Sequence, residues 1–386
     1  MKRATLTDYL LAFIRDSKSV GIVLFACTIL SILLANLPIG ESYIQLFNIE
    51  SDVLHNLHLP HSPLHFINDA LMAVFFFLAG MEIKRELTGG ELSSFKKAML
   101  PTAAAIGGML VPALFFMLIT YGSPYQKGWG IPMATDIAFS LGVASMLGKR
   151  FPTSLKIFLT ALAIIDDLGA ILVIAFFYGG QINLYFLLGA ALVVIVLFAL
   201  NKSRLRFGFW NWLLGIMLWY LVYNSGIHAT IAGVAFAMLV PSKELPRLEH
   251  AFHKYVNFLI LPLFALANTA IQLPSEIGSA LASTLSIGII AGLFLGKPIG
   301  ICLAIYIMVK TKLTELPYKT SWKQLWGMGL LAGIGFTMSI FIASLAFSDA
   351  VSQDTAKVAI LLAVLLSVVT VFIWFSKPSK INKSLS

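Results

Sequence analysis

The feature that most constrains this chain is a pair of adjacent aspartates, Asp166 and Asp167, in the middle of residues 158–177, a stretch that otherwise carries no charge. The stretch is long enough to cross a lipid bilayer as a helix. A charged side chain at mid-membrane costs about 2.5 to 3.5 kcal/mol, so such residues usually face a partner or a water-filled cavity and mark an ion pathway. The pair therefore predicts a chain that folds in lipid around a polar site.

The composition predicts a polytopic membrane protein. Hydrophobic residues make up 59% of the chain and charged residues 12%, and the mean hydropathy is +0.88. Because lipid leaves no partner for unpaired backbone groups, we expect helices, and an all-α fold with a single transmembrane domain over residues 1–386. Twelve apolar runs are long enough to span, at 19–37, 66–83, 98–120, 131–147, 154–177, 183–200, 207–223, 227–241, 255–272, 284–309, 326–347 and 356–375.

The distribution of the +9 net charge predicts the orientation of these spans. Lys and Arg concentrate in alternate loops, as expected for cytoplasmic loops, while residues 38–63 contain neither and Lys127 is a single exception. Both termini should therefore lie in the cytoplasm, and the basic charge indicates topology rather than nucleic-acid binding. The basic residues of the predicted cytoplasmic segments are Lys2, Arg3, Arg15, Lys18, Lys84, Arg85, Lys96, Lys97, Lys149, Arg150, Lys202, Arg204, Arg206, Lys243, Arg247, Lys254, Lys310, Lys312, Lys319, Lys323, Lys377, Lys380 and Lys383.

Four ionisable residues lie deep in the predicted spans: Asp136, Asp166, Asp167 and Lys297. Their insertion costs sum to about 10 to 14 kcal/mol, so they must be compensated by one another, by water or by helix ends. We expect one shared polar cavity; the alternative is a scattering of pairs that only hold helices together. Neighbouring residues on a helix point about 100° apart, so one aspartate can pair with Lys297 while the other faces water.

Two of the predicted spans have the features of broken helices. The fourth span opens with residues 131–142 and is short, and the eleventh contains residues 331–345; Thr135 and Thr337 mark their weak points. The loop charges give these spans opposite orientations, which is the pattern of an inverted-repeat transporter. If the breaks meet, the partial charges of the helix ends need neutralising: Asp136 suits the positive ends and Lys297 the negative ends. The alternative is two Gly-rich spans that are only kinked.

Lys297 lies in a segment with glycine at every fourth position, namely Gly288, Gly292, Gly296 and Gly300. Such a pattern predicts a face of small residues that lets neighbouring helices approach closely.

The external loop 41–63 precedes His65 and contains His55, His58 and His61. A metal site is conceivable, but Pro60 and Pro63 break any helix that could align these imidazoles, so an ordinary polar loop is the preferred interpretation.

Six segments together resemble the bacterial NhaA-type sodium/proton antiporters, a family that is itself a type example of the inverted-repeat architecture. The resemblance runs nearly end to end and is carried by residues 134–139, 161–170, 226–230, 247–250, 296–298 and 333–347. It implies a multi-pass protein of the bacterial inner membrane, with twelve helices of which the fourth and eleventh are unwound and cross. Its activity would be the exchange of cytoplasmic Na⁺ or Li⁺ for external protons, regulated by pH.

The resemblance also implies roles at matching positions. Asp166 and Asp167 would bind the cation and the protons, with Thr135 beside them, and Asp136 and Lys297 would compensate the helix dipoles. Residues affecting the pH response would be Glu82, Arg85, Glu86, His228, Glu249, His253 and Gly335, and Asp69 would be an acid at the outer side of the second span. The family is typically a homodimer whose contact includes an external hairpin, here expected within 41–63.

The chemistry of a carboxylate explains such coupling without reference to a family. A carboxylate is a hard oxygen ligand suited to Na⁺ and equally a proton acceptor, and it cannot hold both ions. Exchange would fade in acid, where protons occupy the site. If two protons leave for each Na⁺, every cycle moves a net charge; the second proton could come from Asp166 or from Lys297.

Three other classes of function use similar residues. An intramembrane aspartyl protease needs two acids on different helices, usually with a Gly-x-Gly-Asp pattern that this sequence lacks. A retinal protein could use Lys297, but twelve spans fit it poorly. A cation channel is the stronger alternative and would need no proton counterflow. We therefore expect a transporter rather than an enzyme, with no cofactor.

Overall fold

The computed structural model describes residues 17–202, 207–273, 276–317 and 320–376. These residues form helices joined by turns and loops, and none of them belongs to a β-strand. The all-α prediction is therefore confirmed for this part of the chain. Nine residues of the charge argument lie outside it, namely Lys2, Arg3, Arg15, Arg204, Arg206, Lys319, Lys377, Lys380 and Lys383.

Fewer helices than predicted are long and apolar enough to cross a membrane. Among the described residues there are seven, or eight if a bent pair of helices counts as one span. The seven are Lys18–Ala35, Pro63–Gly89, Phe95–Ile119, Thr153–Phe177, Leu184–Lys202, Thr284–Lys310 and Ala350–Ser376. Shorter apolar helices occur at three further predicted spans, Ile137–Met146, Phe209–Tyr223 and Thr230–Leu239. A polytopic membrane fold is supported, whereas twelve spans and inverted repeats stay predictions.

The contacts of the chain divide it into two compact units. Unit 1 comprises residues 1–21, 98–166 and 276–386, and unit 2 comprises residues 22–97 and 167–275. The long helices α2 (Ser17–Ala35), α7 (Phe95–Ile119) and α9 (Thr153–Phe177) each belong to both. The interpretation of residues 1–386 as one transmembrane transporter domain stays a prediction.

Unit 1 contains most of α7, the first part of α9 and the C-terminal helices. Its other elements are η3 (Pro124–Met133), α8 (Ile137–Met146), η4 (Gly148–Arg150), α15 (Ile277–Leu281), α16 (Thr284–Ile290), η6 (Ala291–Gly296), α17 (Lys297–Lys310), α18 (Trp322–Ala332), α19 (Phe336–Ala346) and α20 (Ala350–Ser376). Helix α17 packs against α18, and α20 packs against α16, α18 and α19.

The glycine face around Lys297 is confirmed as a packing surface of unit 1. A Cβ atom at Gly300 would lie 2.1 Å from the carbonyl oxygen of Gly107 on α7, and one at Gly296 would lie 2.8 Å from the Cα atom of Pro112. Only residues without side chains allow backbones to approach this closely. The segment that carries Lys297 is thereby held directly against α7.

Both predicted breaks are present in unit 1. The fourth predicted span consists of η3 and α8, separated by residues 134–136 in non-helical conformation. The eleventh consists of α18 and α19, which are bent by 46° at residues 333–335. The backbone N–H and C=O groups at these two breaks therefore need hydrogen-bond partners outside their own helices.

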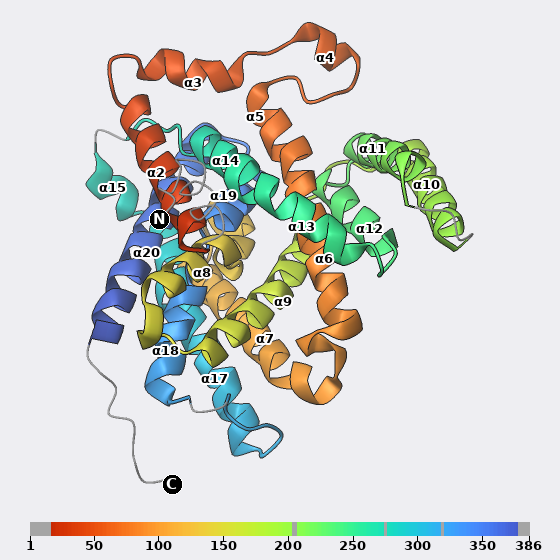
Figure 1. Cartoon of the computed structure of the whole chain (residues 1–386). Helices are drawn as coiled ribbons and strands as arrows, with labels where there is room; N and C mark the ends of the chain where they lie inside the picture. Colours follow the sequence, from red (N-terminus) through yellow and green to blue (C-terminus); the bar gives the residue numbers. More distant parts are fainter. Residues whose placement is uncertain (1–16, 203–206, 274–275, 318–319, 377–386) are drawn as a thin grey trace, which may run out of the picture. The chain divides into compact units, whose positions relative to one another are not determined.

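Unit 2 contains the remaining elements. They are the later part of α2, α3 (Gly40–Asn48), α4 (Asp52–Asn56), α5 (Pro63–His65), η1 (Phe66–Leu71), α6 (Met72–Gly89), η2 (Glu91–Ser93), the end of α9, α10 (Leu184–Lys202), α11 (Phe209–Tyr223), α12 (Thr230–Leu239), α13 (Leu245–Tyr255), η5 (Val256–Ile260) and α14 (Leu261–Asn268). Helices α10 and α11 lie side by side (Figure 1).

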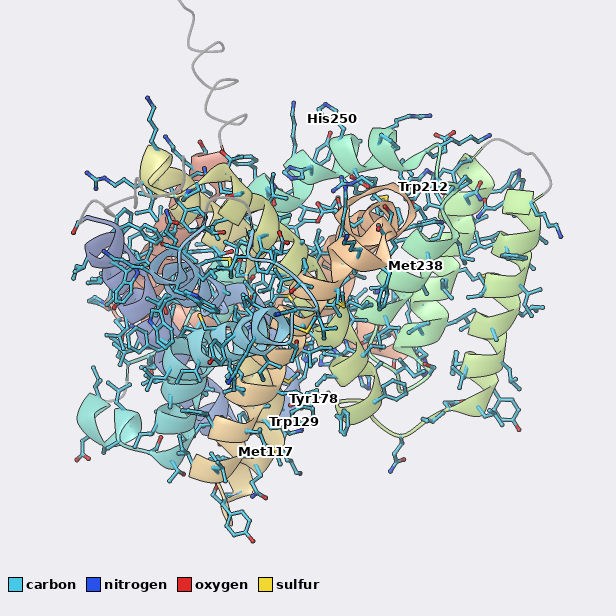
Figure 2. The ribbon with its side chains drawn as sticks, turned by 90° about the horizontal axis from the view of Figure 1, so that it is seen from below. Met117, Trp129, Tyr178, Trp212, Met238 and His250 are labelled. Carbon is cyan, nitrogen blue, oxygen red and sulfur yellow. The ribbon has the colours of Figure 1, made fainter. Side chains whose placement is uncertain are left out.

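Helices α6 and α12 form the closest pair of unit 2. A Cβ atom at Gly233 would lie 2.1 Å from the carbonyl oxygen of Ala73, so the two backbones touch. The rings of Phe77 and Phe236 stack with their centroids 5.1 Å apart, and Trp212 of α11, labelled in Figure 2, meets both of these rings edge-on. Aromatic packing of this kind joins α6, α11 and α12.

The prediction of a hairpin within residues 41–63 is wrong. Residues 41–63 contain α3 and α4, and Tyr43 and Phe47, one helical turn apart, meet edge to face with ring centroids 5.3 Å apart. The apolar residues of this segment recur at helical spacing, a signal that outweighs the strand preference of its Ile, Tyr and Phe residues.

We predict that Gly300→Ala lowers the free energy of unfolding by about 1 to 3 kcal/mol, because the added methyl group meets the backbone of α7. The thermal unfolding midpoint of the purified protein in detergent measures this. Gly278→Ala in α15 is the matched control, because nothing lies within 4 Å of the position of its Cβ atom. Equal midpoints for the two variants would contradict the packing argument.

Candidate functional site

One carboxylate caps the N-termini of two helices in unit 1. Asp136 lies in the break of the fourth predicted span, where its Oδ1 atom accepts a hydrogen bond of 2.8 Å from the backbone N–H of Phe139 in α8. Its Oδ2 atom accepts from both the backbone N–H, at 3.1 Å, and the hydroxyl of Thr337 in α19. Asp136 is 2% exposed, so its charge is compensated by the positive ends of two helix dipoles.

The two breaks contact each other directly. The backbone N–H of Asp136 donates to the carbonyl oxygen of Ile334 at 2.7 Å, and the Ser339 hydroxyl donates to the carbonyl oxygen of Ile131 at 2.8 Å. A Cβ atom at Gly335 would lie 3.0 Å from the carbonyl oxygen of Ala134. The interrupted backbone of each span thus finds partners in the other, as membrane-buried irregular backbone requires.

A buried ion pair lies beside this crossing. The Lys297 ammonium contacts the Oδ2 atom of Asp166 and also donates to the hydroxyl of Thr135 at 2.9 Å. The side chains of Lys297 and Asp166 are both 0% exposed. Lys297 therefore neutralises Asp166 and reaches the C-terminal end of α18 through Thr135, whose hydroxyl lies 2.8 Å from the carbonyl oxygen of Ala332.

The second carboxylate oxygen of the pair is a candidate ligand. Asp166 Oδ1 is buried and has no hydrogen-bond partner among the described residues. Asp167 follows directly on α9 and is 2% exposed. Leaving a buried carboxylate oxygen unpaired is costly unless a proton or a cation binds to it. Two adjacent carboxylates, one held by an ammonium, can bind a hard cation or protons.

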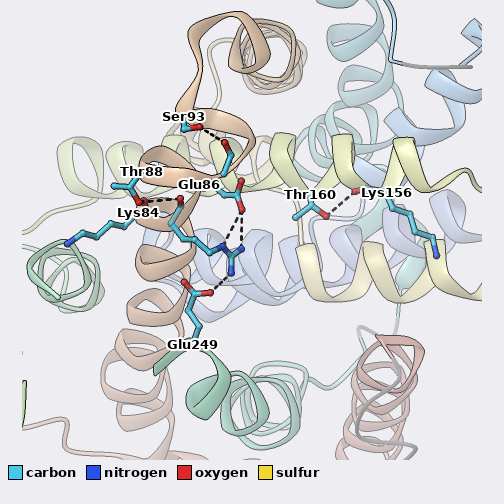
Figure 3. A network of polar contacts seen from close by, with 9 residues as sticks. Lys84, Glu86, Thr88, Ser93, Lys156, Thr160 and Glu249 are labelled. Carbon is cyan, nitrogen blue, oxygen red and sulfur yellow. Dashed lines mark hydrogen bonds and ion pairs between the residues drawn. The ribbon is translucent and has the colours of Figure 1, made fainter. Parts of the chain in front are cut away.

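A second group of charged residues lies in unit 2, at the end of α6 (Figure 3). The guanidinium of Arg85 contacts Glu249 of α13 and lies 3.2 Å from the carboxylate of Glu86. Glu82 interacts electrostatically with Arg85 and Glu249, and the imidazole of His253 lies 3.0 Å from the amide nitrogen of Asn257. The structure thus brings together most of the residues that the family resemblance assigned to the pH response.

Two ionisable groups of α13, Glu249 and His253, have shifted pKa values. Burial raises the pKa of the Glu249 carboxyl above its usual range, although the Arg85 guanidinium beside it acts in the opposite direction. Burial lowers the pKa of His253, and the charges of His250 and Arg85 lower it further. Both shifts disfavour the charged forms, because desolvation dominates.

His228 and Asp69 form a pair in unit 2 that the sequence did not predict. The Nε2 atom of His228 lies 3.5 Å from Asp69 Oδ1, and its Nδ1 atom lies 3.0 Å from the Thr230 hydroxyl. The indole N–H of Trp219 donates to the carbonyl oxygen of Asp69. Both residues were candidates, but 159 positions separate them and nothing in their local patterns connects them. Ser339 was missed because a serine among apolar residues resembles any small packing residue.

Among the described residues, no group of three or more His, Cys, Asp or Glu side chains is arranged to hold a metal ion. His61 does approach His55 and His65: its ring centroid lies 5.7 Å from that of His55 and 4.3 Å from that of His65.

A family model described as "Na+/H+ antiporter 1" matches residues 11–375. The chain belongs to this antiporter family. It is 47% identical over 375 residues to "Na(+)/H(+) antiporter NhaA" of Cytophaga hutchinsonii, covering 95% of each chain. It is 47% identical to the protein of the same name from Rhizobium etli and 44% identical to "Na(+)/H(+) antiporter NhaA 1" of Clostridium beijerinckii, in each case over 92% of both chains. Its relatives are thus transporters rather than enzymes.

We predict that Asp136→Asn destabilises the antiporter by about 0.5 to 2 kcal/mol. The amide has a single acceptor oxygen, so one of the two helix N-termini loses its cap. The thermal unfolding midpoint measures the effect. Asp349→Asn is the control, because Asp349 is an exposed residue that accepts from the backbone N–H of Ser352 at the start of a single helix, α20. An equal or larger loss in Asp349→Asn would argue against the double cap.

A second prediction concerns pH. A raised carboxyl pKa means that the folded protein holds the Glu249 proton more tightly than the unfolded chain, so stability is lost as pH rises through the folded pKa. The side chain introduced by Glu249→Gln does not ionise. The difference between the unfolding midpoints of the variant and of wild type should therefore increase as the pH is raised from about 5 to about 8. Glu276→Gln, at an exposed position, controls for the loss of one negative charge. A flat or falling difference would refute the assignment.

Proposed function

We propose that the protein exchanges cytoplasmic Na⁺ or Li⁺ for external protons across the bacterial inner membrane. Membership of the antiporter family supports Na⁺ and H⁺ as the transported ions. The observation that carries the proposal for the site is the buried Asp166, which is paired with Lys297 on one oxygen, unpaired on the other, and followed directly by Asp167.

The coupling follows from competition at the carboxylates. In the ion-free protein the Lys297 ammonium holds Asp166, and Asp167 is protonated or accessible to a cation. A Na⁺ ion bound between carboxylate oxygens supplies the positive charge that Lys297 or protons supplied before, so its binding releases protons. Because the same oxygens cannot hold both ions, each ion crosses only when the other has left.

The stoichiometry determines whether the exchange responds to voltage. We propose that two protons move against one Na⁺, which transfers one net charge per cycle. Such a charge is worth about 2.3 kcal/mol for each 100 mV of membrane potential. The pairing of Lys297 with Asp166 supports either of them as the donor of the second proton, because breaking the ion pair changes the proton affinity of both groups.

We propose that Glu82, Arg85, Glu86, Glu249 and His253 regulate this exchange by pH, together with His228 and Gly335. The shifted pKa values of Glu249 and His253 support a titrating cluster at the ends of α6 and α13. By the family resemblance, we also propose cytoplasmic termini and a homodimer.

Proteoliposomes that contain a pH-sensitive dye test the proposed exchange. In vesicles with an imposed pH gradient, addition of Na⁺ or Li⁺ should dissipate the gradient, and Asp167→Asn should abolish this response because an amide cannot exchange a proton. Asp52→Asn, at an exposed position of α4, should behave as wild type.

Retained exchange in Asp167→Asn would reject the site assignment. Current without proton movement would instead indicate a cation channel. The exchange rate is also measured with and without a clamped membrane voltage. Equal rates would reject the electrogenic stoichiometry.

A further inference from the structure

An apolar groove of about 420 Å³ lies within unit 2, between α6, α11 and α12. None of the residues that line it has a charged side chain. One end is closed by the rings of Phe77, Trp212 and Phe252, whose centroids lie 5.4 to 5.7 Å apart. Along the walls, the small residues Ala70 and Gly215 leave the space open. The groove therefore suits an apolar ligand and not an ion.

The length of the groove matches one leaflet of a bilayer. On η1 and α6 its lining extends from Phe66 to Phe77, eleven residue steps that span about 16 Å. Helix α11 runs along it in the opposite direction. The indole N–H of Trp219 donates to the carbonyl oxygen of Asp69 near one end, and Trp212 meets the aromatic cluster at the other. The hydrocarbon core of a bilayer is about 30 Å thick, so one leaflet is about 15 Å thick.

The open side of the groove faces lipid. At its rim, Phe66 is 50% exposed and Ile216 is 64% exposed, and both belong to apolar helices. Phe66 lies near the start of the span Pro63–Gly89, the end that the loop charges predict to be external. The mouth of the groove is therefore at the outer leaflet, and its aromatic end lies deeper in the membrane.

The width of the groove admits a single hydrocarbon chain. Divided over about 16 Å, a volume of 420 Å³ gives a mean cross-section of about 26 Å². An α-helix with its side chains is about 10 Å or more across and needs at least roughly 80 Å², so a helix does not fit. Water needs two to four polar partners, and the lining offers almost no polar surface.

We propose that this groove binds one acyl chain of a phospholipid from the outer leaflet. The chain enters beside Phe66, lies along Ala70 and Val74, and ends against the rings of Trp212 and Phe252. It fills the space between α6 and α11 and thereby joins the two helices.

The charges around the groove determine what this site can select. Neither residues 38–63 nor residues 207–242 contain Lys or Arg, so the segments at its outer end offer no cationic side chain of either type to a phosphate group. The binding free energy then comes from burial of the acyl chain, which is proportional to the apolar area removed from the surroundings. The site should therefore recognise the chain and not the headgroup.

The fluorescence of Trp212 tests whether the groove is a defined site. The full chain is purified in detergent, stripped of lipid and titrated with phosphatidylcholine whose acyl chains carry bromine, a contact quencher. The quenching of Trp212, measured as the difference between wild type and Trp212→Phe, should saturate at one lipid per chain. Quenching that increases in proportion to the lipid without saturating would overturn the proposal, because it would reflect partition into the micelle.

A groove-filling substitution tests the position of the chain. Val74→Phe places a ring in the middle of the groove. It should weaken phospholipid binding, measured by native mass spectrometry, by about tenfold or more, the loss expected when two methylene groups are no longer buried. Val196→Phe is the matched control, because it makes the same change on the exposed face of α10, outside the groove, and should bind lipid as wild type does.

Equal losses in Val74→Phe and Val196→Phe would overturn the assignment of the groove. If Val74→Phe does not fold, the saturation of Trp212 quenching still decides the proposal. Phosphatidylglycerol with the same acyl chains should bind as tightly as phosphatidylcholine, and a clear preference for one headgroup would contradict recognition through the chain. Dimers that form only when lipid is withheld would also overturn the proposal, since a second copy would then cover the groove.

Discussion

The cost of placing charge in lipid determines the arrangement of unit 1. A buried carboxylate or ammonium is tolerated only where another charge, a helix end or a polar group compensates it. Lys297 and Asp166 compensate each other, and Asp136 is compensated by the N-termini of α8 and α19. The breaks in the two spans therefore supply the backbone N–H groups that compensate the carboxylate of Asp136. In an unbroken helix these groups would be hydrogen-bonded within the helix.

The sequence predicted the parts of this arrangement that follow from energetic cost. Deep charges in apolar runs, a glycine at every fourth position beside Lys297, and interruptions near Thr135 and Thr337 are visible as local patterns, and each corresponds to an observed contact or break. The choice of Asp166 rather than Asp167 as the partner of Lys297 was left open. Helical geometry sets the angle between the two side chains, but only tertiary packing determines which of them faces α17.

Other features lay outside the reach of local patterns. By resemblance, residues 41–63 were expected to contain a hairpin, yet α3 forms there. Connecting segments vary more among relatives than the elements they connect, so a resemblance carries least information at such positions. Three of the predicted spans are represented by apolar helices of 10 to 15 residues, which composition alone did not distinguish from full crossings. The contact between His228 and Asp69 depends on the residues before α12 meeting η1, and no spacing rule predicts it.

The backbone contact between Gly107 and Gly300 restricts which parts of the site can move. Two helices whose main chains touch cannot turn about their own axes or slide past each other without a collision, so α17 and α7 behave as one stiff body at this point. In the exchange that we propose, the ammonium of Lys297 leaves Asp166 when Na⁺ takes its place. The ammonium then moves by rotation about the carbon–carbon bonds of the lysine side chain, while the backbone of α17 keeps its position.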